Sequence, residues 1–167
     1  DKPGGENNDH VKATTHDGDD SKGIAVIIEC LTDNKNRTVS DLRHVLTKHG
    51  GSLGTNGSVS HLFRKVGIMK LLNVTEDDLL EHMDFVDIED FEMIETDCII
   101  FTKPNELFNT KKYFESKTVQ VADEEIIMDA LITIEMSKDD EEQISDLSSK
   151  IEELDDVQNV YMNASLS

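Results

Sequence analysis

One uninterrupted apolar segment constrains the fold of this chain more than any other feature. Residues 23–31 read Gly-Ile-Ala-Val-Ile-Ile-Glu-Cys-Leu and are rich in β-branched side chains. A continuous run of this kind, without alternation of apolar and polar residues, predicts a strand that is buried on both faces. Trp is absent and aromatic residues make up only 5% of the 167 residues. We therefore expect an aliphatic core built around this strand.

Helical and strand signals alternate along the rest of the chain. Thr38 is expected to cap a helix, with Asp41 three residues later at the positive end of the helix dipole. Gly50-Gly51 supply the left-handed conformation that ends this helix. Further helices are expected at 75–84 with a Thr75 cap, at 105–115, and after Ser137. Strands are expected at 11–16 (a short edge strand), 58–65, 67–72, 91–95, 98–102, 117–121, 131–136 and 157–162.

The order of these elements predicts an α+β fold made of two ferredoxin-like α/β sandwich domains, one inserted into the other. A β-α-β unit is followed by β-α-β-β-α-β and then by a second β-α-β unit. Each domain is expected to place its helices on one face of an antiparallel sheet. We assign residues 1–10 to a disordered lead, 11–66 with 130–167 to the outer domain, and 67–129 to the inserted domain.

The charge of the chain is strongly uneven. The formal net charge is −20, from 16 Lys and Arg against 36 Asp and Glu. Residues 35–70 nevertheless hold seven of the basic residues and a single acid, Asp41. A uniform acidic surface would repel phosphates, whereas this distribution suits a protein that presents one face to a polyanion. The alternative is an acidic surface that serves solubility and a basic segment that arose by chance.

The basic segment carries motifs that resemble the YebC/TACO1 family. Residues 28–39 read Ile-Glu-Cys-Leu-Thr-Asp-Asn-Lys-Asn-Arg-Thr-Val and resemble the family signature. Further matches are Arg43-His44, Thr47-Lys48-His49-Gly50-Gly51, Leu53-Gly-Thr-Asn-Gly-Ser-Val59, Leu62-Phe63, and Asp155-Asp156-Val157-Gln158 before the last strand.

The resemblance implies two nested α+β domains and a role in gene expression without catalysis. Members are described as DNA-binding transcriptional regulators. They are also described as translation factors on ribosomes, including a mitochondrial activator of cytochrome oxidase subunit synthesis. The family also has a basic, helical N-terminal domain to which nothing in these residues corresponds, and we expect the chain to be a fragment or a processed form.

The candidate nucleic-acid-binding residues surround the turn at 32–38, which leads from a buried strand into a helix. Such a turn exposes unpaired backbone N–H groups that, with nearby cations, can hold a phosphate. Two alternatives stay open: Asp33 and Asn34 only form the turn while Arg37 pairs with an acid, and the basic helix side is only a solvated face. The glycine-rich loop from Gly50 to Ser58 can approach phosphates or be a plain loop. The candidates are Lys35, Arg37, Arg43, His44, Lys48, Arg64 and Lys65.

Several chemistries are not indicated by the sequence. Cys30 and Cys98 lie in apolar runs and are expected to be buried thiols in a reducing compartment. No CxxC spacing, histidine cluster or Walker-type loop is present, so we expect neither a metal nor another cofactor. With so few aromatic residues, we expect recognition of backbone and shape with little base stacking.

We therefore expect, first, a translational activator that contacts ribosomal RNA, messenger RNA or a ribosomal protein. The alternatives are a DNA-binding transcriptional regulator and a ligand-sensing regulatory module. We expect a monomer that does not contact membranes or leave the cell, mitochondrial in a eukaryote and cytoplasmic in a bacterium. The acidic stretch from Asp139 to Asp156 is expected to be a solvated helix face, with contact to a basic ribosomal protein as the alternative.

Overall fold

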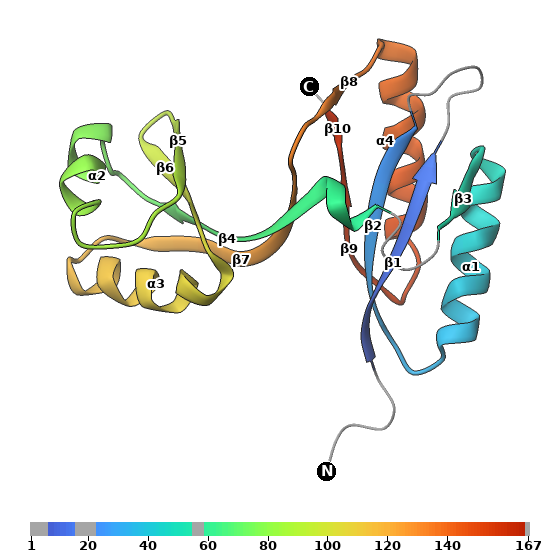
Figure 1. Ribbon diagram of the computed structural model, residues 1–167, viewed down its shortest axis with the longest axis horizontal. Helices are drawn as coiled ribbons and strands as arrows, with labels where there is room; N and C mark the ends of the chain where they lie inside the picture. The colour runs from blue at the N-terminus through green and yellow to red at the C-terminus, as the bar shows by residue number, and fades with distance from the viewer. Residues whose placement is uncertain (1–6, 16–22, 55–58, 166–167) are drawn as a thin grey trace. The chain divides into compact units, whose positions relative to one another are not determined.

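The chain folds into two compact α+β units, shown in the computed structural model of Figure 1. The structure describes residues 7–15, 23–54 and 59–165, with side chains from residue 23 onward. The outer unit takes the chain up to Arg64 and again from Asp129, and the inserted unit is Lys65–Met128. The sequence placed the inserted domain at 67–129. Both units have the ferredoxin-like α/β sandwich arrangement predicted from the sequence.

The outer unit is a four-stranded antiparallel sheet with helices on one face. The strands follow the order β3-β1-β2-β9 across the sheet. The elements are β1 (Asn7–Thr15), β2 (Ile24–Thr32), α1 (Lys35–Lys48), β3 (Gly51–Leu53), α4 (Lys138–Glu152) and β9 (Val157–Met162). A separate two-stranded parallel pair consists of β8 (Ile134–Glu135) and β10 (Ala164–Ser165).

The predicted central strand is confirmed by β2, which is buried on both faces. Its alternate residues face α1 and α4, while Ala25 and Ile27 on the opposite face are also buried. This core is aliphatic apart from one thiol, because helical spacing places one stripe of each helix on the sheet. Its buried members are Ile24, Val26, Ile28, Cys30, Leu42, Leu46, Ile144, Leu147, Ile151 and Ala164.

The inserted unit has the strand order β5-β6-β4-β7. This order is that of a split β-α-β fold. One β-α-β unit connects β4 to β5 with β6 between them in the sheet, and the other connects β6 to β7 with β4 between them. Leu71, Cys98, Ile100 and Phe114 lie in its buried core. The elements are β4 (Phe63–Leu71), α2 (Glu76–His82), β5 (Asp90–Ile94), β6 (Asp97–Thr102), η2 (Pro104–Glu106), α3 (Leu107–Ser116) and β7 (Val121–Ala130).

Three of the local signals predicted from the sequence are confirmed. Thr75 and Asp78 form a reciprocal capping box at the start of α2. The hydroxyl of Ser137 accepts a hydrogen bond from the N–H of Asp140 and caps α4. Gly50 has a φ of 78° and follows the last turn of α1. Each signal acts within four residues, so the sequence alone is sufficient to locate it.

Five predicted elements are wrong. Residues 7–10 are not a disordered lead, since they belong to β1, and residues 1–6 lie outside the described chain. β1 is not an edge strand, because it lies between β3 and β2. Strand pairing satisfies the backbone of this polar segment whatever its composition.

The strands expected at 58–65 and 67–72 are instead a 3-10 turn, Ser60–Leu62, followed by the single strand β4. The strand expected at 117–121 is in fact β7, which runs through Asp123-Glu124-Glu125 with these side chains exposed. Exposed carboxylates do not prevent pairing of the strand, because the ladder is formed by main-chain groups.

Replacement of Gly67 by Ala is expected to destabilise the chain by about 1–3 kcal/mol through overpacking. A Cβ at this position would lie 2.7 Å from Thr102 Oγ1 and 3.0 Å from Leu107 Cβ and Cδ1, where β4 meets β6 and the start of α3. Urea unfolding measures the loss. Thr102→Ala removes the nearer obstacle, so the double variant should lose less free energy than the sum of the single variants. Strict additivity would contradict this close contact.

Candidate nucleic-acid interface

The turn between β2 and α1 is organised by Asn34 and Thr32. The N–H of Asn34 donates to Thr32 Oγ1 at 3.0 Å, and Asn34 Oδ1 accepts from the N–H of Arg37 at 3.1 Å. Asn34 is therefore the N-cap and α1 begins at Lys35, so the prediction of a Thr38 cap is wrong. Asn is among the strongest N-cap residues. Here its side chain accepts a hydrogen bond from the N–H of Arg37, which is therefore no longer unpaired and available to a phosphate.

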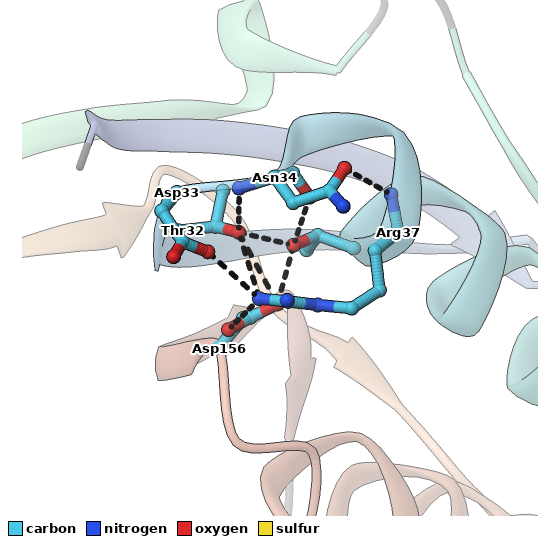
Figure 2. Close-up of polar contacts among 6 residues, drawn as sticks. Thr32, Asp33, Asn34, Arg37 and Asp156 are labelled. Atoms are coloured by element: carbon cyan, nitrogen blue, oxygen red, sulfur yellow. Dashed lines mark hydrogen bonds and ion pairs between the residues drawn. The ribbon is translucent and has the colours of Figure 1, made fainter. Parts of the chain in front are cut away.

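The side chains of this turn meet Asp156, which lies in the turn between α4 and β9 (Figure 2). We call this junction of the two turns the corner. Thr38 Oγ1 donates to Asp156 Oδ2 at 2.6 Å, and Thr32 Oγ1 donates to the same oxygen at 3.2 Å. Arg37 Nη2 donates to both carboxylate oxygens at 3.0 Å. The backbone carbonyl of Asp156 also accepts from the N–H of Leu31 at 2.8 Å. One residue thus joins the end of β2, the first turn of α1 and the start of β9.

Arg37 is consequently engaged by carboxylates of the chain itself, with its side chain 48% exposed. Besides Asp156, it donates from Nη2 to Asp33 Oδ1 at 3.2 Å. Of the two interpretations of Arg37 left open by the sequence, the structure shows the one in which Arg37 pairs with an acid. Two carboxylates around one guanidinium leave no net positive charge at this point, so a phosphate gains little there.

The hydrogen bonds at this corner shift the ionisation of Asp156. The hydroxyl of Thr38, and next the guanidinium of Arg37, stabilise the charged form and hold the pKa of the Asp156 carboxyl below its ordinary value of 3.8. The same contact raises the pKa of the Arg37 guanidinium further above its usual range. Asp156 is therefore ionised throughout the physiological range, and its side chain is only 16% exposed.

Three of the remaining candidates form a cationic face on the exposed side of α1. Arg43, His44 and Lys48 are all exposed, whereas Leu42 and Leu46 of the same helix are fully buried. Within the described residues, no carboxylate forms an ion pair with these three side chains. We call Arg43, His44 and Lys48 the α1 cationic face. Lys35 is exposed at the first position of α1, about two turns before this face.

Arg64 and Lys65 are exposed in β4 at the junction of the two units. Arg64 ends the first part of the outer unit and Lys65 begins the inserted unit. The expectation that they extend the surface of α1 stays a prediction. Of the glycine-rich loop, Gly51–Leu53 forms β3 and pairs with β1. Residues 55–58 of that loop lie outside the described chain.

Two functional features were missed by the sequence reasoning. Asp156 was noted only within a family motif, since its partners lie 118 to 124 residues away. Exposed aromatic surface was not expected, yet Phe85 is 73% and Phe108 is 66% exposed. Both phenylalanines belong to the inserted unit. Composition counts aromatic residues but does not show which of them remain outside a core.

The described residues contain no cluster of three or more His, Cys, Asp or Glu side chains that could hold a metal ion. Cys30 and Cys98 are buried free thiols, as the sequence predicted. Burial raises the pKa of the Cys98 thiol to about 11, so it is protonated at neutral pH and a poor nucleophile. In the same part of the chain, no helix is long and apolar enough to cross a membrane.

The fold and this site define a class of nested two-domain α+β proteins whose outer domain carries a cationic helix. The profile of the TACO1/YebC second and third domains matches residues 11–164. The chain belongs to the TACO1/YebC family, as its motifs suggested.

Relatives of known sequence and structure support this assignment. A probable transcriptional regulatory protein of Francisella tularensis is 37% identical over 98% of this chain and 67% of its own length. One from Thermoanaerobacter pseudethanolicus is 38% identical over 94% of this chain and 65% of its own. The crystal structure of a conserved hypothetical protein from Aquifex aeolicus matches with a TM-score of 0.82 and 34% identity, over 99% of this chain and 68% of that one. The chain thus spans about two thirds of the length of its relatives.

Replacement of Asp156 by Asn is expected to lower the melting temperature by about 5 °C, because Arg37 and Thr38 lose a charged acceptor. Asp155→Asn is the matched control, since it removes the same charge from the adjacent, exposed residue. Thermal unfolding followed by circular dichroism measures both variants. Equal melting temperatures for the two variants would show that Asp156 does not hold the corner together.

The stabilisation by Asp156 should also depend on pH. Because its folded pKa lies below the ordinary 3.8, the unfolded chain binds this proton first as the pH falls. The contribution is therefore fully present above the unfolded pKa and is lost as the pH falls through the folded pKa. Urea unfolding should give a constant difference between wild type and Asp156→Asn above about pH 5, shrinking at lower pH. A difference that grows with acidity would contradict the assignment.

Proposed function

We propose that this chain is a non-enzymatic regulator of gene expression that acts as a translational activator on a bacterial-type or mitochondrial ribosome. Membership of the TACO1/YebC family supports a regulatory role, as do relatives named probable transcriptional regulatory proteins. The contacts proposed are with ribosomal RNA, messenger RNA or a ribosomal protein. No cofactor is part of this proposal, and the protein acts as a monomer.

The observation that carries the proposal is the α1 cationic face. A chain with a net charge of −20 is repelled by nucleic acid at long range, so any approach depends on a local reversal of sign. Arg43 and Lys48 supply the positive charges of this reversal on a rigid helix, and His44 lies exposed beside them. Lysine and arginine side chains that contact phosphates position a protein on nucleic acid and carry no sequence information by themselves.

A DNA-binding transcriptional regulator is the second candidate, because the relatives carry that description in their names. The α1 cationic face does not distinguish DNA phosphates from RNA phosphates. A short basic helix without further base-reading groups favours a structured RNA, whose backbone presents shape and 2′-hydroxyl groups. The relatives named above are bacterial, which favours the cytoplasm as the compartment.

Reversal of charge in Arg43→Glu with Lys48→Glu should weaken cosedimentation with ribosomes about tenfold at moderate salt. The wild-type complex should dissociate as salt rises, and the variant should show a shallower dependence because fewer counterions are released. Quantitative sedimentation over a salt series measures both effects, with the full-length protein tested beside this chain. Arg37 is left unchanged, since its replacement would also disturb the corner at Asp156.

The matched control is Lys138→Glu with Lys150→Glu, which reverses two charges on α4 of the same unit. This control should bind ribosomes about as well as the wild type. Equal losses in both double variants would show that total charge, and not the α1 cationic face, determines binding. A gel shift on promoter DNA that survives competitor, without ribosome binding, would favour the transcriptional alternative.

A further inference from the structure

The inserted unit has an open groove between the turn after α2 and helix α3 that the proposed function does not use. The groove has a volume of about 480 Å³. Phe85 and Tyr113 line it together with three carboxylates, those of Asp84, Asp87 and Glu106. It lies wholly within the inserted unit, so its shape does not depend on the outer unit.

An aromatic pair forms one wall of this groove. The rings of Phe85 and Tyr113 stack with centroids 6.4 Å apart and planes inclined by 15°. A hydrogen bond between the hydroxyl of Tyr113 and His82 Nδ1, at 2.9 Å, holds the ring of Tyr113 in place. The ring of Phe85 is among the most exposed large apolar side chains in the described chain. Together with Tyr113, its exposed face offers a partner an apolar surface rimmed by polar groups.

The charge of the groove is negative. Lys103 reaches Asp87 only at 3.6 Å, with both side chains more than half exposed. Within the described residues, no cation forms an ion pair with Asp84 or Glu106. A phosphate would meet three carboxylates here, so nucleic acid is disfavoured at this groove.

The neighbouring rings already accept cations from the chain itself. Lys117 Nζ lies 5.6 Å from the centre of the Tyr113 ring, and Lys112 Nζ lies 5.2 Å from that of Phe108. These contacts are within the range of cation–π attraction. They show that rings of α3 are accessible to a positive group of side-chain size.

We propose that the groove binds an arginine side chain from a basic segment of a partner protein. A guanidinium is planar, so it can stack on the open face of Phe85 and donate hydrogen bonds from its edge to Asp84 and Glu106. An ammonium matches the charge but not the planar shape, so arginine should bind better than lysine. Aromatic anchors with charged neighbours are typical of the centres of protein interfaces.

The experiment titrates the isotopically labelled chain with a nine-residue peptide of alternating Gly and Arg and follows amide shifts by NMR. Shifts should concentrate at residues 84–87 and 106–113. Phe85→Ala should weaken binding about fivefold through loss of the stacking surface. Replacing every Arg of the peptide by Lys should weaken binding to the wild type, and replacing every Arg by citrulline should abolish it.

A matched pair of double variants separates the groove from total charge. Asp84→Asn with Glu106→Gln should weaken binding about tenfold. Asp139→Asn with Glu142→Gln removes two charges from α4 and should change binding less than twofold. All replaced side chains lie at the surface or partly exposed, and circular dichroism checks that each variant is folded.

Equal losses in the two double variants, or amide shifts centred on α4, would overturn the proposal. Single-stranded RNA that shifts residues 84–87 where the arginine peptide does not would also overturn it. These outcomes leave the ribosome test of the α1 cationic face unaffected, because that test uses variants of the outer unit.

Discussion

The corner that joins the two halves of the outer domain is organised around a single carboxylate. Asp156 accepts hydrogen bonds from Thr32, Arg37 and Thr38, and its backbone holds the end of β2. The inserted domain separates Asp156 from Thr38 by 118 residues of sequence. The corner can therefore form only after both halves of the outer domain have come together. Several charge-assisted hydrogen bonds that converge on one carboxylate, whose side chain is only 16% exposed, can fix such a distant junction.

This junction determines which cations remain available at the surface. Arg37 and Lys48 are both basic residues of α1, yet Arg37 is bound by Asp33 and Asp156. Arg43, His44 and Lys48 lie further along the helix, beyond the reach of that turn. The surface proposed for nucleic acid is thus smaller than the basic segment of the sequence. It is also more clearly separated from the residues that stabilise the fold.

Together the two proposals give the chain two surfaces that prefer ligands of opposite charge. The α1 cationic face in the outer domain suits phosphates, and the groove beside Phe85 in the inserted domain suits a basic protein segment. Ribosomes present both kinds of surface, since basic proteins lie on an RNA scaffold. A strongly acidic chain with one cationic helix can select orientation on such a surface by repulsion as well as attraction.

The sequence alone determined the elements whose signals are local. Continuous β-branched residues located β2, and the capping residues Thr75 and Ser137 located α2 and α4, because such signals act within one or two turns. The resemblance to the TACO1/YebC family could likewise be read from the sequence alone, because each of its motifs is a short run of contiguous residues. Only the tertiary structure decided that β1 lies inside the sheet and that Arg37 meets Asp156. Both depend on partners brought close by folding, and a linear pattern of residue types does not encode which distant carboxylate a given arginine will reach.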